Sequence, residues 1–269
     1  MESPRKWMAE LMLRAPAPLR SLRDVPVVGP LIHGVSHRVL PADEKVWARV
    51  EAGPARGLWL KLNPRTGQSY LRGDAEPTVQ AILQERLRGG MVFYDLGANI
   101  GLFSLLAARL VGSQGKVFSF EPDATVASRL RENAARNGFA NITVVEAGVW
   151  SRSGAMNFES ADASSPDQGV GRFVADGSGN SGIARPCVAL DDFVQQAPQP
   201  DLIKCDVEGA EVEVFLGAEK MLRERRPSVI CEMHSEENEK ALRTLFRNAR
   251  YEAKPIDANH ILATRQGGE

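Results

Sequence analysis

The sequence predicts an α/β protein built on a doubly wound, mostly parallel, seven-stranded Rossmann-like sheet. Two observations predict this fold class. First, the apolar run from Val92 ends at Asp95 and enters a turn with two glycines, after which apolar residues recur at helical rather than strand spacing. Second, apolar β-prone runs and amphipathic helical stretches alternate from there toward the C-terminus, which is typical of a parallel sheet with helices on both faces.

The elements of this sheet follow in order along the chain. We expect strands near residues 91–95, 117–121, 142–147, 201–206 and 228–232. We expect helices near residues 101–111, 123–137, 211–224 and 236–249. Alternating residues at 251–256 and 260–264, around the turn Asp257-Ala258-Asn259, predict an antiparallel hairpin that closes the sheet.

Upstream of the sheet, residues 57–90 predict a small hairpin and a lead-in helix. Leu58–Leu62 alternates between apolar and other residues, a turn follows, and Ser69–Leu71 is expected to return as the second strand. Helical spacing begins after Glu76 and stops at Gly89-Gly90.

Two segments depart from the α/β alternation. Residues 1–56 form an N-terminal extension before one domain at residues 57–269, and prolines interrupt the extension repeatedly. Trp7 to Leu13 predicts a short basic amphipathic helix, which packs on the domain or on a partner subunit of a homo-oligomer, or else binds a membrane surface. Residues 160–182 are rich in serine and glycine, so we expect either a lid over the substrate or a disordered loop.

Bulk composition narrows the function classes. The net charge of −1 gives no general electrostatic attraction to nucleic acid or to anionic membranes. No apolar run approaches the roughly 18 to 20 residues that a membrane span needs, and the N-terminus lacks the apolar core of a signal peptide. The three cysteines form no C-x-x-C pair, which argues against zinc and against a disulfide framework. The composition therefore predicts a reduced, cytoplasmic protein.

The loop after the first strand of the sheet indicates the kind of ligand. A dinucleotide loop carries three glycines, and here only Gly97 and Gly101 fit that pattern. The carboxylate of Asp95 would repel phosphates, whereas it suits a cationic ligand or an amine. S-adenosylmethionine is such a ligand, because it carries a sulfonium and an α-amino group and no phosphate. We expect Gly97, Ala98 and Asn99 to lie against it and Gly101 to let the helix pack closely. The competing interpretation of Asp95 is a simple turn former.

The next two strand ends extend this ligand site. The strand near 117–121 ends at Glu121-Pro122, where a carboxylate at the sheet edge can accept hydrogen bonds from both ribose hydroxyls. Pro122 then starts a helix, in which a missing N–H is tolerated at the first turn. The exit of the third strand, at Ala147 and Gly148, is expected to line the adenine through backbone groups, and Glu146 suits this role less well.

A second constellation begins at the strand near 201–206. Lys204 and Asp206 lie on the same side of that strand by the period of two, and Glu208 follows in the loop. A lysine in a central strand needs a carboxylate partner or a lowered pKa. Lys204 is therefore either the ion-pair partner that orients Asp206 or a general base for a hydroxyl.

The neighbouring strand adds further polar groups at the same edge. It ends at Glu232, and His234 follows, so these side chains are expected to converge with Asp206 and Glu208. Carboxylates and an imidazole suit Mg²⁺ or Mn²⁺, with Asp206, Glu232 and His234 as ligands, and such an ion would lower the pKa of a bound hydroxyl. Without a metal, Asp206 or His234 acts as the base. His234 alone has a third interpretation, as a cap of the helix that starts at Ser235.

From about Gly57 to Thr264 the chain resembles the FkbM family of S-adenosylmethionine-dependent methyltransferases. The K-x-D-x-E-G-A-E string that starts at Lys204 is specific to this family, whereas the glycine loop alone marks the wider class I group. The matching residues are Gly73 to Pro77, the Asp95–Gly101 loop, Phe120-Glu121-Pro122, Asn133, Asn137, Leu190 to Phe193, Ile203 to Glu211, and Arg226-Pro227 to Glu232.

The resemblance implies methyl transfer to a hydroxyl of a sugar, a polyketide or a related natural product. It marks Glu76, Asp206 and Glu208 as active-site positions, of which Glu76 and Asp206 also border the cofactor. It carries five residues over as cofactor contacts, which are Asp95, Gly97, Asn99, Gly101 and Glu121. The extension at residues 1–56 matches nothing in the family.

Three other function classes compete with a small-molecule O-methyltransferase. A nucleic-acid methyltransferase would need a basic channel or stacking aromatic residues, and the segment from Asp206 to Glu208 is acidic instead. A non-catalytic scaffold that binds a partner through its N-terminal arm would keep the fold, but Asp95, Glu121 and Asp206 are all present, which argues against lost catalysis. A dehydrogenase conflicts with the two-glycine loop.

Overall fold

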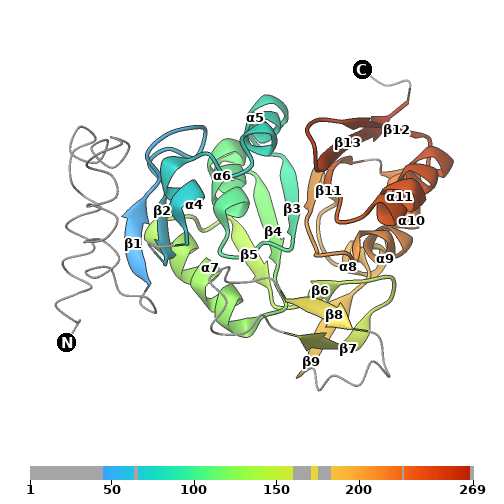
Figure 1. Ribbon diagram of the computed structural model, residues 1–269, viewed down its shortest axis with the longest axis horizontal. Helices are drawn as coiled ribbons and strands as arrows, with labels where there is room; N and C mark the ends of the chain where they lie inside the picture. Colours follow the sequence, from blue (N-terminus) through green and yellow to red (C-terminus); the bar gives the residue numbers. More distant parts are fainter. Residues whose placement is uncertain (1–44, 64–65, 160–170, 175–182, 226, 267–269) are drawn as a thin grey trace, which may run out of the picture. The chain divides into compact units, whose positions relative to one another are not determined.

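The computed structural model describes residues 45–63, 66–159, 171–174, 183–225 and 227–266 (Figure 1). The chain divides into two compact units, with the division between Ala75 and Glu76. The predicted N-terminal helix and most of the predicted lid lie outside the described residues. Every helix in the described part of the chain is too short or too polar to cross a bilayer.

The first unit contains a two-stranded sheet and a short helix. Strand β1 (Val46–Arg49) pairs antiparallel with β2 (Trp59–Leu62), and helix α4 spans Gln68–Arg72. The predicted return strand at Ser69–Leu71 is therefore wrong, because these residues lie in α4. β2 pairs instead with the strand that precedes it, in which Val46 and Ala48 are buried in alternation. The three residues of Ser69–Leu71 show no alternation of apolar and polar side chains, so their sequence does not distinguish a strand from a helical turn.

The second unit is organised by a seven-stranded sheet, as predicted. The strand order is β12-β13-β11-β10-β3-β4-β5, in which β10 lies between β3 and β11. The pairs from β11 to β5 are parallel, and β13 is antiparallel to both of its neighbours. The strands are β3 (Val92–Leu96), β4 (Lys116–Phe120), β5 (Ile142–Val145), β10 (Leu202–Cys205), β11 (Ser228–Glu232), β12 (Tyr251–Pro255) and β13 (His260–Arg265).

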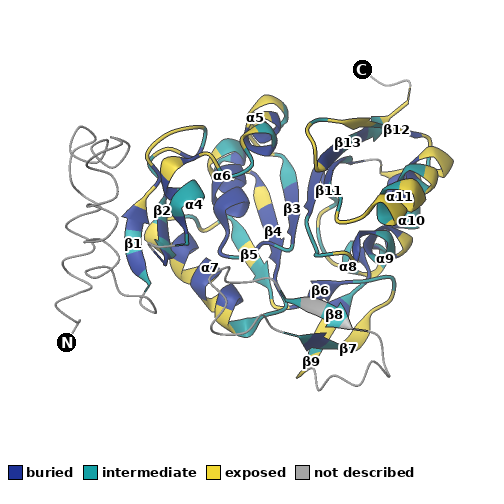
Figure 2. Cartoon of the chain, in the orientation of Figure 1, coloured by how far each residue is buried: buried dark blue, intermediate teal, exposed yellow. Residues whose placement is uncertain are grey.

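Helices cover both faces of this sheet, which confirms the doubly wound class. Tyr94 on β3 and Ile203 on β10 belong to an apolar core that includes Phe215 and Phe246 of the C-terminal helices. The strand side chains that alternate with these core residues point to the opposite face of the sheet, toward α6. There the hydroxyl of Ser104 on α6 donates a hydrogen bond to Asp95. Figure 2 shows the central strands as buried. The helices are α5 (Pro77–Arg86), α6 (Leu102–Val111), α7 (Ala124–Arg136), α8 (Leu190–Phe193), α9 (Glu211–Leu216), α10 (Glu219–Glu224) and α11 (Glu236–Asn248).

The single helix predicted at residues 211–224 is wrong, because α9 and α10 are separate helices. α9 ends at Gly217, where an added Cβ would lie 2.3 Å from the carbonyl oxygen of Trp150. Asp191 on α8 then accepts hydrogen bonds from the backbone N–H groups of Lys220 and Met221 at the start of α10. This side-chain cap satisfies donors that a helix start leaves open, so it stabilises the break.

A second, four-stranded sheet was not predicted. It has the order β6-β9-β7-β8, with β6 at Gly148–Val149, β7 at Gly154–Glu159, β8 at Arg172–Val174 and β9 at Ile183–Val188. β8 lies inside the segment that we expected to form a lid. These strands are short and interrupted by glycine-rich and serine-rich sequence, so their alternation is too brief to recognise.

The loop after β3 is pressed against the end of β10. Gly97 has a φ of +76°, and an added Cβ there would lie 1.8 Å from the carbonyl oxygen of Asp206. The N–H of Asp206 in turn donates to the carbonyl of Leu96 at 3.0 Å. An added Cβ at Gly101 would lie 2.8 Å from the side chain of Leu130 on α7. Both glycines thus allow close contacts within the protein, whereas we had expected Gly97 to make room for the ligand.

We predict that Gly97→Ala destabilises the fold far more than Gly138→Ala. Both glycines have a positive φ, +76° and +74°, but Gly138 has no atom within 4 Å of its added Cβ. Backbone strain of about 1 to 2 kcal/mol therefore applies to both variants, whereas steric displacement of about 1 to 3 kcal/mol applies only to Gly97→Ala. Urea unfolding of the two variants measures the difference. Equal losses would refute the contact between the two loops as the reason for Gly97.

Candidate active site

A cleft opens at the carboxyl ends of β3, β4 and β10. It holds about 540 Å³ of empty space, open solvent at its mouth included. Seven of the site residues predicted from the sequence line this cleft, namely Gly97, Asn99, Glu121, Pro122, Gly148, Asp206 and Glu208. These residues come from strand ends that are far apart in the sequence, as expected for the ligand edge of a doubly wound sheet.

Glu121 is held as a buried acceptor at the end of β4. Its side chain is 3% exposed, and its two carboxylate oxygens accept hydrogen bonds from the backbone N–H groups of Asn99 and Asp123, both at 2.9 Å. Burial raises the pKa of Glu121 to about 8. Asn99 reaches this position with a φ of +50°. Each oxygen keeps a further acceptor site for a ligand hydroxyl.

Asp95 does not line the cleft but lies buried behind it. Its Oδ2 accepts a hydrogen bond from Ser104 at 2.5 Å, and its Oδ1 has no hydrogen-bond partner among the described residues. Burial raises its pKa to about 6, although the nearby charge of Lys204 acts in the opposite direction. A buried carboxylate with an unused oxygen fits a cationic or donating ligand group nearby.

Lys204 places a charge in the interior of the sheet. It is the register partner of Asp95 on the neighbouring strand and is 2% exposed. Its Nζ lies 3.0 Å from Asp206, 3.7 Å from Glu76 and 4.5 Å from the centre of the Phe103 ring. Burial alone would lower the pKa of Lys204, but the negative charges of Asp206, Glu76 and Asp95 raise it well above its ordinary value. This geometry supports the ion-pair interpretation of Lys204 rather than a general base.

Asp206 and Glu208 are two carboxylates with different proton affinities. Burial would raise the pKa of Asp206, but the charge and hydrogen bond of Lys204 lower it below its ordinary value. Burial and the charge of Asp206 raise the pKa of Glu208. Glu208 has a φ of +55°, so its side chain is presented from a strained turn. The pair thus offers a fixed anion beside a better proton acceptor.

His234 is a hydrogen-bond donor to a buried carboxylate. Its Nδ1 lies 2.7 Å from Oε1 of the fully buried Glu211, and its Nε2 lies 3.4 Å from Glu208 and 3.8 Å from Asp206. The hydrogen bond to Glu211 raises the pKa of His234 to about 9, so the ring is an imidazolium at neutral pH. Ser235, not His234, caps α11, because its Oγ accepts from the N–H of Asn238.

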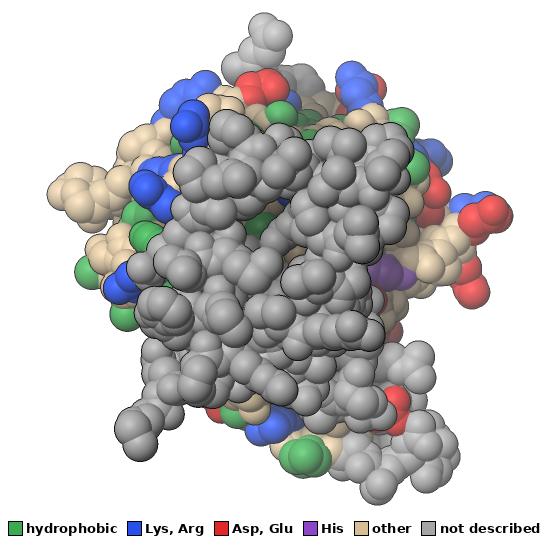
Figure 3. All heavy atoms as spheres, turned by 60° about the vertical axis from the view of Figure 1, so that its left-hand side comes forward, with side chains coloured by type: hydrophobic (Ala, Val, Ile, Leu, Met, Phe, Trp, Pro, Cys, Tyr) green, Lys and Arg blue, Asp and Glu red, His purple; other side chains and the backbone are tan. Residues whose placement is uncertain are grey.

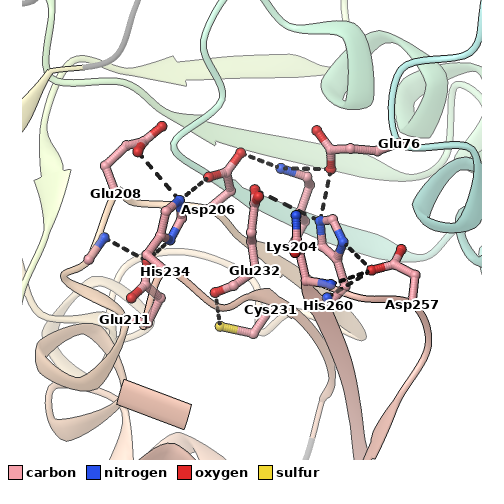
Figure 4. A network of polar contacts seen from close by, with 12 residues as sticks. Glu76, Lys204, Asp206, Glu208, Glu211, Cys231, Glu232, His234, Asp257 and His260 are labelled. Atoms are coloured by element: carbon pink, nitrogen blue, oxygen red, sulfur yellow. Dashed lines mark hydrogen bonds and ion pairs between the residues drawn. The ribbon is translucent and has the colours of Figure 1, made fainter. Parts of the chain in front are cut away.

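The strand ends also gather a second histidine that sequence reasoning missed. His260 lies at the start of β13, opposite Glu232, and its Nε2 lies 3.2 Å from Glu76 and 3.8 Å from Glu232 (Figure 4). Its Nδ1 lies 2.9 Å from Asp257. The sequence placed His260 only in the closing hairpin. Pairing that hairpin against the end of β11 would have brought His260 beside Glu232.

The structure brings close together the three metal ligands that we predicted from the sequence. One donor atom each of Asp206, Glu232 and His234 lies within 4.8 Å of the others. Burial and the charges of Asp206 and Glu76 raise the pKa of Glu232 to about 7. The donor set suits a divalent ion, and the metal assignment itself stays a proposal.

Some predicted site residues do not line the cleft, and several residues that were not predicted as site residues do. Ala98, Gly101 and Ala147 belong to the loops around the cleft rather than to its wall. The second sheet instead contributes Phe158, Gly171 and Phe173 to the lining. The two phenyl rings lie 5.2 Å apart, and the Phe173 ring packs against Gly148. No periodic signal in the sequence predicted this aromatic wall.

Comparisons with known proteins identify the family of this chain. The profile of the family described as "Methyltransferase FkbM domain" matches residues 95–253, more than half of the chain. The hexuronic acid methyltransferase AglP of Haloferax volcanii is 29% identical over 202 residues, which are 73% of this chain and 79% of that protein. A probable cobalt-precorrin-6B C(15)-methyltransferase (decarboxylating) of Sulfolobus acidocaldarius is 32% identical over 71 residues, 26% of this chain and 37% of that protein.

A solved structure shares the fold. The crystal structure of methyltransferase FkbM from Methylobacillus flagellatus KT matches with a TM-score of 0.50 and 18% sequence identity. The match covers 76% of this chain and 48% of that chain, so this chain spans about half the length of the solved relative.

We predict that Lys204→Met destabilises the protein by about 3 to 5 kcal/mol at pH 7, because it leaves buried carboxylates without their cation. In the wild type, Lys204 lowers the pKa of Asp206. The stability that this ion pair contributes is therefore fully present above the ordinary pKa of aspartate, and it is lost as the pH falls through the lowered pKa. Without Lys204 the carboxylates take up protons more readily, so the gap between the variant and the wild type narrows from pH 7 to pH 5.

Urea unfolding at both pH values measures this gap. Lys116→Met, which removes an exposed lysine at the start of β4, is the control and is expected to change stability by less than about 0.5 kcal/mol. A gap for Lys204→Met that stays constant between pH 7 and pH 5 would contradict the ion-pair assignment.

Proposed function

The chain belongs to the FkbM family of S-adenosylmethionine-dependent methyltransferases, and we propose that it methylates a hydroxyl group of a sugar or of a sugar-bearing natural product. The observation that carries this proposal is the position of Asp206 and Glu208, which line the same cleft as Gly97 and Glu121. A proton acceptor is thus adjacent to the residues proposed for the cofactor.

The residues of the cleft fit the proposed cofactor. Glu121 offers two oxygens, already oriented by backbone N–H groups, to the ribose hydroxyls. Behind the cleft wall, the buried carboxylate of Asp95 adds a negative charge near the site, which suits a cationic cofactor better than one that carries phosphates. When bound, S-adenosylmethionine supplies an electrophilic methyl group that its sulfonium activates. Gly148 and the Phe158 and Phe173 rings give the cleft an apolar wall for a flat ring system.

The acidic end of the cleft fits an acceptor hydroxyl. Asp206, kept ionised by Lys204, accepts a hydrogen bond from the hydroxyl and orients its oxygen. Glu208 takes the proton, because burial and the charge of Asp206 raise its pKa above that of an ordinary glutamate. His234, as an imidazolium, lies 3.4 Å from Glu208 and limits the repulsion between the two carboxylates.

Two observations favour a small sugar-like acceptor over a nucleic acid. The relative AglP is a hexuronic acid methyltransferase, and a hexuronic acid is a sugar acid. Two carboxylates, Asp206 and Glu208, line the cleft, where they would repel a phosphate backbone. At the margins of the view in Figure 3, Lys and Arg side chains lie near Asp and Glu side chains.

We predict that Asp206→Asn lowers kcat by about 10²-fold, because it removes the fixed anion that orients the acceptor hydroxyl. Its affinity for S-adenosylhomocysteine should stay within about threefold of the wild type, since ribose recognition is assigned to Glu121. Transfer of a radiolabelled methyl group to a panel of sugars and uronic acids measures kcat. Glu236→Gln, an exposed change whose side chain is 93% accessible, is the control. A fully active Asp206→Asn would refute its role, and no transfer to any hydroxyl in the panel would argue against the acceptor class.

We predict that Glu121→Ala weakens S-adenosylhomocysteine binding by about 10- to 100-fold, because it removes both acceptors of the ribose hydroxyls and each hydrogen bond contributes about 0.5 to 1.5 kcal/mol. Calorimetric titration measures the affinity, and circular dichroism confirms that the variant folds. The matched control is Glu146→Ala, which removes a 41% exposed carboxylate from the exit of the next strand. If Glu121→Ala binds as tightly as Glu146→Ala, the ribose assignment is wrong.

A further inference from the structure

Three side chains behind the catalytic carboxylates form a compact donor set. Glu76 lies at the start of α5, Glu232 at the end of β11, and His260 at the start of β13. One donor atom of each lies within 4.8 Å of the others. Figure 4 shows Glu76 and Glu232 approaching the His260 ring from two directions, with Asp257 on its other side. We propose that Glu76, Glu232 and His260 bind a divalent metal ion.

The state of His260 is the first argument for a metal. The residue is 6% exposed, and its Nε2 makes no hydrogen bond within the described part of the chain. Oε2 of Glu76, 3.2 Å away, is also buried and also lacks a hydrogen bond there, so the two atoms approach without hydrogen-bond alignment. A cation between these two buried atoms would give each of them a closer partner than their ion pair provides.

The orientation of His260 is the second argument. Its Nδ1 lies 2.9 Å from Oδ1 of Asp257, and that oxygen also accepts hydrogen bonds from the N–H groups of Asn259 and His260. Asp257 is therefore fixed by the turn and would hold the ring proton on Nδ1 when a metal replaces the proton on Nε2. The lone pair of Nε2 would then face Glu76 and Glu232. A carboxylate behind a histidine is the usual support of a metal-bound imidazole.

The separations are compatible with coordination. Two ligands at right angles, each about 2.1 Å from a metal, lie about 3.0 Å apart. The distances from Nε2 of His260 are 3.2 Å to Glu76 and 3.8 Å to Glu232, so small side-chain movements would complete the set. Mixed imidazole and carboxylate donors suit Mn²⁺ or Zn²⁺. Three protein ligands leave further coordination positions for water or for a bound oxygen.

The overlapping set of Asp206, Glu232 and His234 is less suited to a metal. Asp206 already has a hydrogen bond from Lys204, and both nitrogens of His234 face carboxylates, one of them the buried Glu211 at 2.7 Å. The His234 side chain is also 23% exposed.

The charges around His260 favour an added cation. Glu76, Glu232 and Asp257 face a single imidazole there, and Lys204 lies 3.7 Å from Glu76. Lys204 thus compensates only one of these three carboxylates, Glu76, and it also pairs with Asp206 at 3.0 Å. A divalent ion would balance this excess of negative charge.

Titration of the full-length, EDTA-treated protein with MnCl₂ tests the proposal. We expect one Mn²⁺ per chain by calorimetry and by electron paramagnetic resonance, and a higher Tm with Mn²⁺ present. His260→Gln should weaken binding at least about tenfold, and Asp257→Asn by about 10- to 100-fold. Glu252→Gln, an exposed change on β12 whose side chain is 53% accessible, should leave binding unchanged. ZnCl₂ is titrated in the same way.

The outcomes separate the alternatives. If neither Mn²⁺ nor Zn²⁺ binds the wild type, no metal site exists and His260 is only a charged partner of Glu76. If His234→Gln abolishes binding and His260→Gln does not, the ion belongs to the overlapping set and the proposal is wrong. The Mn²⁺-induced rise in Tm, compared between the wild type and a folded His260→Gln variant, gives a readout without substrate. The proposal does not depend on methyl transfer, because no cofactor or acceptor is present in these measurements.

Discussion

The charge of Lys204 is the constraint on which the site depends. A lysine that is 2% exposed in a central strand of the sheet can stay ionised only if carboxylates surround it, and Asp206, Glu76 and Asp95 do so. Each of these acids comes from a different element, namely the loop after β10, the start of α5, and β3. One buried ammonium group therefore fixes the relative positions of three chain segments at the ligand edge of the sheet.

Backbone strain accumulates at the same edge. Among the described residues, four that are not glycine have a positive φ, and three of these are Glu76, Asn99 and Glu208. Each contributes an acidic side chain or a backbone N–H to the network around the cleft. Such conformations persist only where surrounding contacts compensate for them, and they concentrate at functional sites. Here the compensating contacts are the ion pairs of Lys204 and the hydrogen bonds to Glu121.

The sequence predicted the sheet and its acidic edge because both depend on local patterns. The strand ends at Asp95, Glu121, Asp206 and Glu232 are each visible as an apolar run followed by a carboxylate, and the parallel topology then brings them together. The second sheet, with its aromatic wall, was missed because strands of two to six residues carry too little alternation. His260 was missed because its place depends on the antiparallel register of β13 against β11, which no local pattern encodes.

The pairing of Asp206 with Lys204 also joins stability to function at one residue. In many sites the reacting groups lie on loops that the core does not need. In this chain the carboxylate that we propose orients the acceptor is also the nearest partner of a buried cation, at 3.0 Å. In the Asp206→Asn variant, the neutral amide would keep a hydrogen-bond acceptor for Lys204 but remove the charge. Loss of activity in such a variant must therefore be compared with its unfolding free energy before it is assigned to chemistry, since the same side chain serves both.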